Sequence, residues 1–372
     1  MIAIILSGVI VIGRLVIRFG VGGDPWQQGD WLINYSAGYV RRGLVGHIAY
    51  LFNQSGIVGL DTLLFVGQTF AFVGFLVAVV YLMLQRVPRY ELLLIVISPA
   101  FVFFTLWDFQ GGLRKDILLL FLFAWLTVWS TRPLVRVLER KIYLGAWIVT
   151  PAFLGFNHEG LLFYLPFMYL ALWLVGKDRN FAAKKIWGAI IASSLLAAVP
   201  FVLSVLYPGT QEQSETICTS LVDAGKRERF CWGAISAIGW SLQRGLDQTA
   251  SMVSLWYIPA VLLAMIPFVL FRYSKKVLLW AALAAVAVLP LFVLGGDWGR
   301  WIHLYVAIAS IIVLRGVSTG DIAYRMKSPP KVNSLVATPI LLAYSLAWHI
   351  PHYSAENLAP GPVRLFQGLF GG

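Results

Sequence analysis

Apolar runs of transmembrane length recur along the whole chain, and they limit the folds open to it more than any other feature. A transmembrane α-helix needs about 20 predominantly apolar residues, and these runs lack the two-residue alternation of a membrane β-barrel. Eleven runs lie near residues 1–18, 58–84, 91–107, 116–130, 143–156, 161–176, 186–206, 252–271, 277–294, 302–314 and 333–350. The sequence therefore predicts an all-α, polytopic transmembrane helical bundle of about 11 spans, forming a single integral membrane domain over residues 1–372.

Composition excludes a soluble globule, because 59% of the residues are hydrophobic and only 12% are charged. In a soluble protein the net charge of +12 would suggest nucleic acid as a partner, but in a membrane protein basic residues are read loop by loop. We therefore expect a lipid bilayer and no nucleic acid among the partners. The first run has no basic leader before it and no small-residue cleavage site after it, so we interpret it as a span and not as a signal peptide.

Lysine and arginine concentrate in alternate connectors, which is typical of cytoplasmic loops. These connectors hold more than half of the 29 basic residues: Arg86 and Arg89; Arg132, Arg136, Arg140 and Lys141; Lys177, Arg179, Lys184 and Lys185; Arg272, Lys275 and Lys276; Arg315, Arg325, Lys327 and Lys331. The positive-inside rule then places the N-terminus inside and the C-terminus outside, in agreement with an odd number of spans.

The remaining connectors are predicted to be exterior, and most of them carry charged clusters. They are residues 19–57, 107–116, 157–160, 207–250, 295–301 and the tail after Ile350. Charged side chains at membrane depth are costly, and when they recur at the same ends of several helices they usually line a water-filled site. The sequence therefore predicts one common site on the exterior face.

The first exterior loop, residues 19–57, contains the polar and aromatic stretch DPWQQGDWLINYSAGYVRRGLVG. Asp24 and Asp30 are candidates for acid/base chemistry, and Arg41 and Arg42 are cations suited to a phosphate. The alternative is an interfacial amphipathic segment in which the aromatic side chains lie at headgroup level and the arginines meet lipid phosphates. We expect interfacial helices in this loop.

Two further connectors, WDFQGGLRKD and NHEG, carry candidate site residues. Arg114 and Lys115 can bind a phosphate or pyrophosphate, and the alternative is a snorkelling pair that begins the next helix. A four-residue connector between two apolar helices has no obvious structural need for adjacent His158 and Glu159. His158 is a candidate general base or hydrogen-bond donor, with Glu159 as its partner or as an acceptor for sugar hydroxyls.

The connector GGDWGRW contains Asp297, Trp298, Arg300 and Trp301. Asp297 and Arg300 are spaced for a salt bridge across a turn, which is the structural interpretation. In the functional interpretation, Arg300 faces an anionic lipid head while Trp298 or Trp301 stacks on a sugar ring.

The exterior loop 207–250 contains both cysteines of the chain, Cys218 and Cys231. On an oxidising face this pair is predicted to form a disulfide, which would restrict the unfolded chain by about 3 kcal/mol; two free thiols are the alternative. The polar composition of the loop predicts a small cap over the exterior cavity rather than a separate domain.

Sequence motifs for common cofactors are absent. The chain has no Walker loop, no GxGxxG fingerprint, no zinc signature and no serine-hydrolase elbow, and no second histidine lies at metal-ligand spacing from His158. We expect no cofactor, with a divalent metal ion as the open alternative.

A first span followed by a long exterior loop with an acidic residue and interfacial aromatics resembles the membrane glycosyltransferases of the GT-C class. In that class the base that activates the acceptor hydroxyl typically lies in this loop, often as an aspartate, so the resemblance implies Asp30 or Asp24 here and leaves the choice open. The pieces DWLINYSAGYVRRGLVG, GGLRKD, NHEG and GGDWGRW are also similar to those of proteins of bacterial surface-polysaccharide assembly, including repeat-unit polymerases. The resemblance implies a location in the bacterial inner membrane.

We therefore expect a transferase that moves a sugar from a polyprenyl-phosphate-linked donor to a glycan or lipid-linked acceptor on the extracytoplasmic face. Asp30 or Asp24 would be the base, and His158 and Glu159 would orient the acceptor or share in proton transfer. The expected phosphate binders are Arg41, Arg42, Arg114, Lys115 and Arg300. One alternative is a polymerase that joins polyprenyl-pyrophosphate-linked oligosaccharides, with His158 or an aspartate as base. A lipid-linked glycan transporter or flippase ranks third, because the sequence shows no internal repeats.

Overall fold

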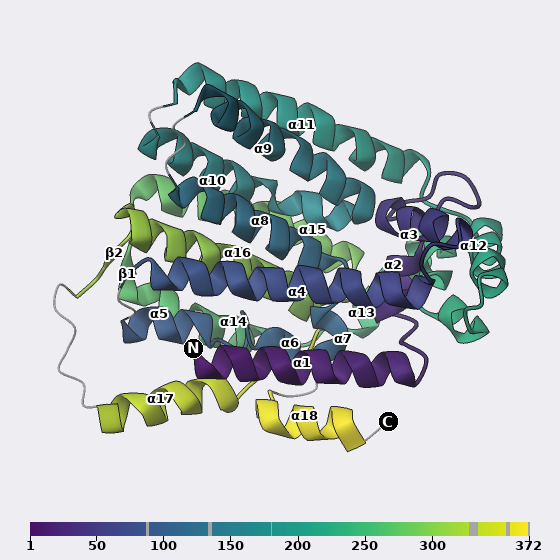
Figure 1. Ribbon diagram of the computed structural model, residues 1–372. Coiled ribbons are helices and arrows are strands. Elements are labelled where there is room, and N and C mark those ends of the chain that lie inside the picture. The colour runs from purple at the N-terminus through teal and green to yellow at the C-terminus, as the bar shows by residue number, and fades with distance from the viewer. Residues whose placement is uncertain (87–88, 133–135, 180, 327–333, 355–357, 371–372) are drawn as a thin grey trace.

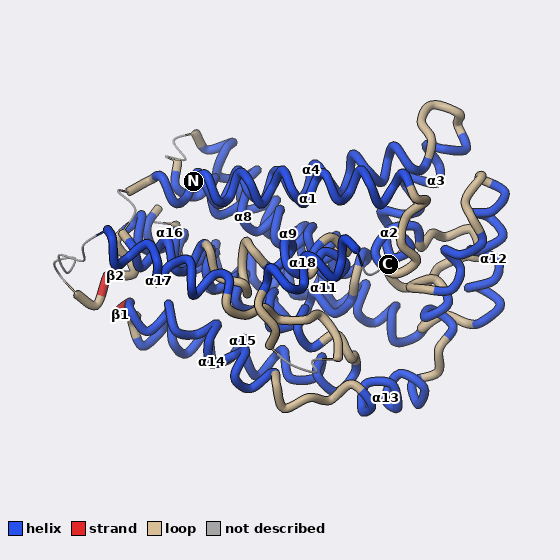
Figure 2. The backbone as a smooth tube through the Cα atoms, turned by 90° about the horizontal axis from the view of Figure 1, so that it is seen from below, coloured by secondary structure: helices blue, strands red, loops and turns tan. Residues whose placement is uncertain are grey.

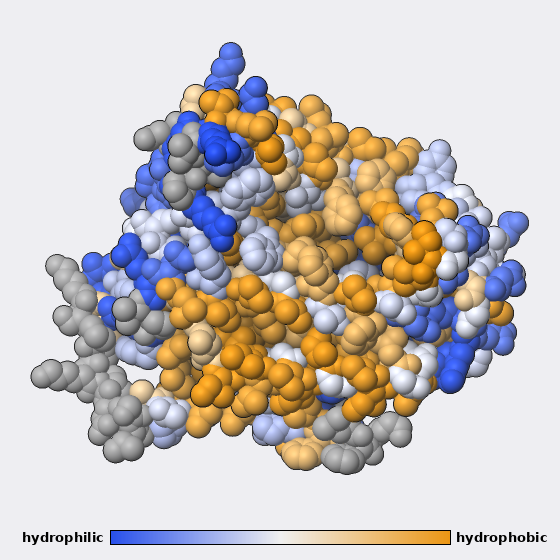
Figure 3. Space-filling model, viewed as in Figure 1, coloured by the Kyte–Doolittle hydropathy of each residue, from blue (hydrophilic) through white to orange (hydrophobic). Residues whose placement is uncertain are grey.

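The computed structural model describes residues 1–86, 89–132, 136–179, 181–326, 334–354 and 358–370. Six of the described helices are long and apolar enough to cross a membrane: Ile2–Gly20, Leu60–Leu84, Glu159–Asp178, Ala183–Leu206, Lys275–Leu294 and Trp298–Thr319. Three shorter apolar helices are Asp116–Thr131, Tyr257–Leu270 and Ala337–Leu346. Figure 3 shows hydrophobic side chains in a broad central band and hydrophilic ones gathered toward the two ends. The chain is therefore an all-α membrane protein, as the sequence predicts.

The long helices run side by side in one bundle (Figures 1 and 2). α9 (Val137–Asn157) packs along α11 (Ala183–Leu206), and α4 (Leu60–Leu84) packs along α8 (Asp116–Thr131). α16 (Trp298–Thr319) contacts α4, α8 and α15, and it is the most buried of the six long helices. The other helices of the bundle are α1 (Ile2–Gly20), α10 (Leu165–Asp178) with the preceding 3₁₀ turn η1 (Glu159–Tyr164), α14 (Tyr257–Met265) with η4 (Ile266–Leu270), α15 (Lys275–Leu294), α17 (Ser334–Leu346) and α18 (Gly361–Phe370).

The basic connectors gather at one end of the bundle, where β1 (Phe271–Arg272) pairs antiparallel with β2 (Ala323–Tyr324). Arg315 was expected in one of these loops, but it lies inside α16 and is buried. Its guanidinium forms ion pairs with Asp178 and, at 3.1 Å, with Asp321. Lys327 and Lys331 lie outside the described residues. Arg315 therefore ties α16 to α10 at this end and does not lie in a loop.

The prediction of one continuous span over residues 91–107 is wrong. α5 (Tyr90–Val96) ends just before Ser98 and Pro99, because proline lacks the backbone N–H of a helix and disfavours helical geometry in the residue before it. Turns follow, and then the four-residue helices α6 (Phe104–Trp107) and α7 (Phe109–Gly112). Residues 98–109 are all buried. This irregular backbone is enclosed by protein, the setting in which membrane proteins tolerate it.

The first connector forms two helices that differ in their exposure. α2 (Gln27–Leu32) is buried at every position, so it is a core element and not an interfacial helix. α3 (Leu44–Gln54) exposes the apolar side chains of Ile48, Leu51 and Phe52. Exposed apolar groups of this kind suit the boundary between headgroups and acyl chains.

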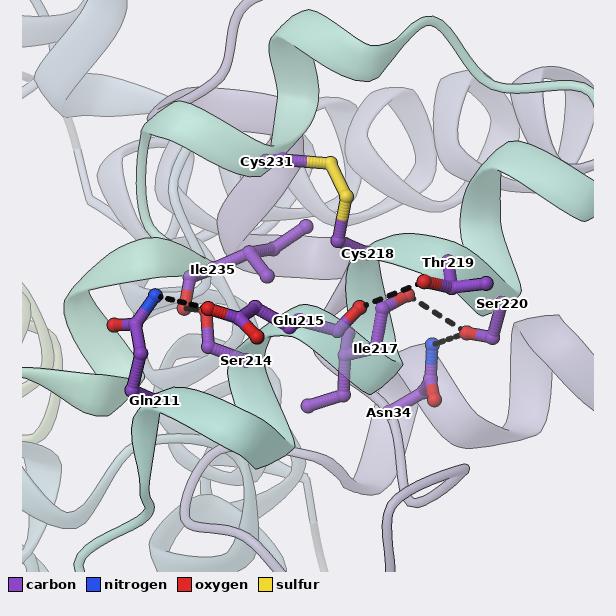
Figure 4. The surroundings of a disulfide bond; sticks show 10 residues. All are labelled: Asn34, Gln211, Ser214, Glu215, Ile217, Cys218, Thr219, Ser220, Cys231 and Ile235. Atoms are coloured by element: carbon purple, nitrogen blue, oxygen red, sulfur yellow. Dashed lines mark hydrogen bonds between the residues drawn. A yellow bond between two sulfur atoms is a disulfide. The ribbon is translucent and has the colours of Figure 1, made fainter.

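The loop 207–250 folds into a helical cap at the end of the bundle opposite the strands (Figures 1 and 2). Its elements are α12 (Gln211–Asp223), η2 (Glu228–Trp232), η3 (Ser236–Gly239) and α13 (Leu242–Ser251). Figure 4 shows the disulfide between Cys218 and Cys231, which joins α12 to η2 across a Cα–Cα distance of 5.3 Å. Beside it, Ser214 of α12 donates a hydrogen bond to the carbonyl oxygen of Ile235 at 3.0 Å. The cap is therefore a compact unit held by a covalent and a polar cross-link.

The cap also forms hydrogen bonds with the first connector. Arg229 donates hydrogen bonds to the carbonyl oxygens of Val21 and Gly23, and the Ala234 amide donates to the Pro25 carbonyl oxygen at 3.0 Å. Gly23 lies at φ +83°, and a Cβ atom there would come within 2.5 Å of the Phe230 ring. Glycine is therefore required at this contact by both its backbone angle and the close approach of the cap.

Candidate functional site

A cavity of about 410 Å³ with charged, polar and apolar side chains in its lining lies at the cap end of the bundle. Each of the six connectors that the sequence predicts to be exterior contributes to its wall. The charged, aromatic and amide side chains of the lining are Trp26, Arg41, Arg42, Gln110, Arg114, His158, Trp240, Gln248, Asp297, Trp301, His352 and Tyr353. The expectation that these scattered clusters meet in one place therefore agrees with the geometry.

Arg41 and Arg42 both reach Glu159, the acidic residue of the NHEG connector. Arg42 Nη2 lies 2.6 Å from Glu159 Oε1, and Arg41 Nη1 lies 3.5 Å from the same oxygen. One carboxylate faces two guanidinium groups, so the cluster keeps a net positive charge. The two arginine side chains are also more exposed, at 26% and 24%, than the carboxylate between them, at 16%. The cavity therefore offers an incoming anion positive charge that protein carboxylates do not fully neutralise.

Lys115 was expected to bind phosphate, but it lies beneath the cavity wall and is fully buried. Its ammonium donates a hydrogen bond to the carbonyl oxygen of Arg42, while its backbone amide donates to Asp30 Oδ2 at 3.1 Å. Burial lowers the pKa of Lys115 to about 8, and the nearby Asp30 carboxylate acts in the opposite direction. Lys115 supports the arginine pair from behind and does not line the cavity.

Asp30, one of the two candidate bases, is 1% exposed and does not line the cavity. Burial alone would raise the pKa of its carboxyl, but the positive charge of Lys115 and then that of Arg114 outweigh burial and lower it. Oδ1 of Asp30 is buried and has no hydrogen-bond partner among the described residues. Asp30 is therefore an ionised carboxylate behind the wall, at the N-terminal end of α8, where a negative charge is favoured.

Asp24, the other candidate base, organises the turn that leads into α2. Its Oδ1 accepts hydrogen bonds from the backbone amides of Trp26 at 2.9 Å and Gln27 at 2.7 Å. The Gln110 side chain donates to both Asp24 oxygens, at 3.2 and 3.1 Å. With these donors around it, Asp24 has the contacts of a helix-capping residue.

A chain of alternating charges runs along the wall from Arg114 to Asp116. Arg114 Nη1 lies 3.1 Å from Asp297 Oδ2, and the same oxygen pairs with Arg300. Arg300 in turn donates from Nε to Asp116 Oδ2 at 2.7 Å. Burial alone would raise the pKa of Asp297, but Arg300 and Arg114 lower it. The salt bridge expected between Asp297 and Arg300 is therefore present.

Only some residues of this series of ion pairs reach the cavity. Arg300 is 1% exposed and lies behind the lining, whereas Arg114 and Asp297 line the cavity. Of the two tryptophans expected to stack on a sugar, Trp301 lines the cavity and Trp298 does not; the Trp298 indole donates to the Phe292 carbonyl oxygen at 2.9 Å. Arg300 and Trp298 thus support the wall, and Arg114 and Trp301 face the space.

His158 lines the cavity next to Trp301, with the two rings 5.9 Å apart. Its Nδ1 accepts a hydrogen bond from the Gly160 amide at 3.1 Å, so in the neutral ring the proton lies on Nε2. Burial, and next the charge of Arg42, lower the pKa of His158 well below its ordinary value. His158 is therefore a neutral hydrogen-bond donor, which favours the donor role among those expected for it.

Several cavity residues carry no local sequence signal and were not expected. His352 lies in the tail after the last apolar run, and its partner Asp108 lies 244 positions earlier in the chain. Trp26 and Trp240, which meet edge to face at 6.0 Å, come from two different connectors. The clustering of aromatic residues in the first loop pointed to Trp26 only as an interfacial anchor. A single histidine or tryptophan becomes informative only when the fold shows what faces it.

Comparisons with family models, curated proteins and solved structures found no match to this chain. Within the described parts of the chain, no group of three or more histidine, cysteine, aspartate and glutamate side chains could hold a metal ion.

Proposed function

We propose that the protein transfers a sugar from a polyprenyl-phosphate-linked donor to a glycan or lipid-linked acceptor in surface glycan assembly. The observation that carries the proposal is the convergence of Arg41, Arg42 and Arg114 on one cavity at the end of an apolar helical bundle. A lipid-linked phosphate needs both features, because its chain requires an apolar environment and its head requires cations.

The cavity lining also suits the sugar and the acceptor. Trp26, Trp240 and Trp301 offer flat faces against which a sugar ring can pack, and Gln110 and Gln248 offer amide groups for hydroxyls. The donor head would bind between the arginine pair and Arg114, with its chain directed toward the bilayer. His158 would donate a hydrogen bond to the sugar or to the phosphate.

Two features support an extracytoplasmic position for the cavity. The cap beside it contains the disulfide between Cys218 and Cys231, and such bonds persist in oxidising compartments. The basic connectors lie at the other end of the bundle, the end that the positive-inside rule assigns to the cytoplasm. These features support the proposed orientation, with the N-terminus inside and the C-terminus outside; the proposed location in a bacterial inner membrane follows from the resemblance alone. The two helices that follow α1 in the first connector support a GT-C-like arrangement.

The second candidate is a polymerase that joins polyprenyl-pyrophosphate-linked oligosaccharides. It is favoured by the number of guanidinium groups at the cavity, because a pyrophosphate carries more negative charge than a phosphate. The two candidates differ in the donor that they consume, so one assay separates them.

The test uses purified protein in nanodiscs with a radiolabelled polyprenyl-phosphate hexose or a polyprenyl-pyrophosphate oligosaccharide as donor. Arg41 is the best position to vary, because its contact with Glu159 is the looser one and its buried Nε has no hydrogen-bond partner among the described residues. Loss of a charge-assisted contact of about 1.5–3 kcal/mol in Arg41→Gln should raise the donor KM roughly 10- to 150-fold.

Arg272→Gln is the matched control, since Arg272 is exposed on β1 at the other end of the bundle. We expect this variant to keep the KM of the wild type. Turnover of the pyrophosphate donor alone would favour the polymerase. Absence of transfer from either donor by the wild-type protein would refute both candidates.

A further inference from the structure

A buried carboxylate and a histidine form a tightly coupled pair at the cavity wall. His352 Nδ1 lies 2.7 Å from Asp108 Oδ1 and 2.8 Å from Asp108 Oδ2, and the His352 backbone amide donates to Oδ2 at 2.7 Å. Asp108 is 2% exposed and His352 is 3% exposed. One carboxylate thus holds both the ring and the backbone of this histidine.

The pair fixes which ring nitrogen carries the proton. Asp108 accepts hydrogen bonds from the backbone amides of Gly111 at 3.0 Å and His352 at 2.7 Å, and such donors stabilise the ionised form of a carboxyl group. An ionised carboxylate only accepts hydrogen bonds, so Nδ1 of His352 must be the protonated nitrogen. Nε2 is then the unprotonated nitrogen of the neutral ring, and the hydrogen bonds that the His352 ring forms with described residues all use Nδ1.

The surrounding backbone holds His352 in this position. The Gly299 amide, in the first turn of α16, donates to the His352 carbonyl oxygen at 3.2 Å. A Cβ atom at Gly111 would lie 2.6 Å from the His352 Cβ, so α7 approaches the histidine as closely as glycine allows. Contacts from α7 and α16 therefore hold the ring in place before any substrate binds, as a catalytic group requires.

His352 and His158 line the same cavity in opposite tautomers. Nδ1 of His158 accepts from the Gly160 amide and leaves an N–H at Nε2, whereas Nδ1 of His352 donates to Asp108 and leaves a lone pair at Nε2. A neutral imidazole with a free lone pair can remove a proton, and one with a free N–H cannot. Of the two histidines, His158 therefore offers a hydrogen-bond donor to the cavity and His352 offers a proton acceptor.

Among the acidic and basic groups near the cavity, His352 has the geometry of a general base. Asp30 lies behind the wall, Asp24 is engaged by two backbone amides and Gln110, and Asp297 forms ion pairs with Arg114 and Arg300. A carboxylate engaged by cations is a weakened base. His352 combines a lining position, a free nitrogen and a carboxylate that stabilises the imidazolium once it forms.

We propose that His352, held by Asp108, is the proton acceptor of the transfer reaction, an assignment that rests on the proposed function. The acceptor hydroxyl oxygen bonds to the anomeric carbon of the donor sugar while its proton passes to His352 Nε2. The bond between that carbon and the phosphate oxygen breaks, and its electron pair leaves with the polyprenyl phosphate, whose charge the cavity arginines stabilise. The imidazolium then releases its proton to water. Asp108 is a positioning residue, because it acts through His352.

The test is chemical rescue in the nanodisc transfer assay. General-base catalysis contributes about 10²- to 10⁴-fold, so His352→Ala should lower kcat by that factor and leave the donor KM within about threefold. Added imidazole should restore a measurable part of the lost kcat, since a free base can enter the space left by the side chain. A purely structural role for His352 would give no such rescue.

His349→Ala is the matched control, because His349 lies in the same segment, bonds the Ala359 carbonyl oxygen through Nδ1 and does not line the cavity. Imidazole should leave this variant unchanged, and equal rescue of both variants would overturn the assignment. If the wild type is active but His352→Ala is either fully active or not rescued by imidazole, the role of His352 is overturned. The proposed function would still stand. An inactive wild type would refute the proposed function and, with it, the role of His352.

A measurement independent of activity checks the tautomer. In protein labelled with ¹⁵N at histidine, the His352 signal should report a protonated Nδ1 and an unprotonated Nε2. Asp108→Asn should change this pattern, because an amide N–H facing Nδ1 favours the proton on Nε2, and kcat should fall with it. A wild-type ring protonated at Nε2 would contradict the proposal whatever the activity.

Discussion

Lys115 donates a hydrogen bond from its buried ammonium group to the carbonyl oxygen of Arg42, a residue held at φ +68°. This left-handed region is uncommon for a residue with a side chain and costs on the order of 1–3 kcal/mol, so the conformation persists only where surrounding contacts offset that cost. Lys115 therefore stabilises the backbone geometry from which the Arg42 side chain reaches Glu159 and the cavity. The position of Arg42 thus depends on a residue that does not line the cavity.

Lys115→Met should weaken donor binding without removing a group from the cavity. Methionine has a similar length but donates no hydrogen bond, so the Arg42 backbone can leave its strained conformation. We expect the donor KM to rise by roughly tenfold, the equivalent of about 1.4 kcal/mol, with kcat changed little. Steady-state kinetics in nanodiscs would measure both constants, and an unchanged KM would show that Arg42 keeps its position without Lys115.

The same lysine predicts a pH dependence of stability. Burial lowers the pKa of Lys115 from 10.5 to about 8 in the folded protein, so between these values the unfolded chain binds more protons than the folded one. The contribution of Lys115 to stability should then rise with pH across this window, by at most about 3.4 kcal/mol, and the ammonium should carry its full burial cost below pH 8. Thermal unfolding of the wild type and Lys115→Met from pH 7 to 10 would test this. Parallel curves for the two proteins would contradict it.

Asp30→Asn should act mainly on stability. The change replaces an ionised acceptor of the Lys115 amide and removes the charge that faces the Lys115 ammonium, so we expect a loss of about 1.5–3 kcal/mol. With His352 as the proton acceptor, kcat should stay within about tenfold of the wild type. If kcat instead fell by about 10²- to 10⁴-fold while thermal stability was unchanged, Asp30 would be the base.

Asp24→Asn provides the comparison. Asparagine caps helices about as well as aspartate, and its Oδ1 can still accept from the Trp26 and Gln27 amides. Only the bonds from Gln110 are weakened. We expect a loss of at most about 1 kcal/mol and nearly unchanged kcat, measured by thermal unfolding and in the transfer assay. A large fall in kcat for this variant alone would assign the base to Asp24.

The helical class and the meeting of the connectors could be predicted because each depends on a local pattern. Apolar runs of fixed length predict helices, and alternating basic loops predict which ends lie together. The break in the run 91–107 was also encoded locally, by Ser98 and Pro99, but the high hydrophobicity on both sides concealed it. Apolarity predicts burial but not helical structure: residues 98–103 are buried and lie outside any helix.

The proton-transfer pair could not be predicted from the sequence, because its evidence is a contact between distant segments. Asp108 stands in WDFQGGLRKD, where Arg114 and Lys115 drew attention, and His352 stands alone in the tail. The sequence also does not show which side chains line the cavity and which are buried behind it. Lys115 follows Arg114 directly, yet only Arg114 lines the cavity. One residue of shift around the start of a helix turns a side chain from the cavity to the core.

Removal of the disulfide should destabilise the cap and, through it, the first connector. For the loop closed by Cys218 and Cys231, 13 positions apart, the expected loss is about 3 kcal/mol. In the double variant of both cysteines to serine, the cap contacts with Gly23 and Pro25 should open more often, which limited proteolysis of the loop 207–250 would detect. Thiol labelling of the unreduced wild type should find no reactive thiol, and two labelled thiols would contradict the bond.

The orientation in the membrane can be tested with reporter fusions after Arg140 and after Gly372. Arg140 lies in the first turns of α9, at the bundle end that also holds β1 and β2, and the charge of the connectors assigns this end to the cytoplasm. We expect the reporter after Arg140 to be cytoplasmic and the one after Gly372 to be extracytoplasmic. Because the disulfide lies at the opposite end of the bundle, an extracytoplasmic reporter after Arg140 would place Cys218 and Cys231 in a reducing compartment. That result would remove the support for the disulfide and for an extracytoplasmic cavity together.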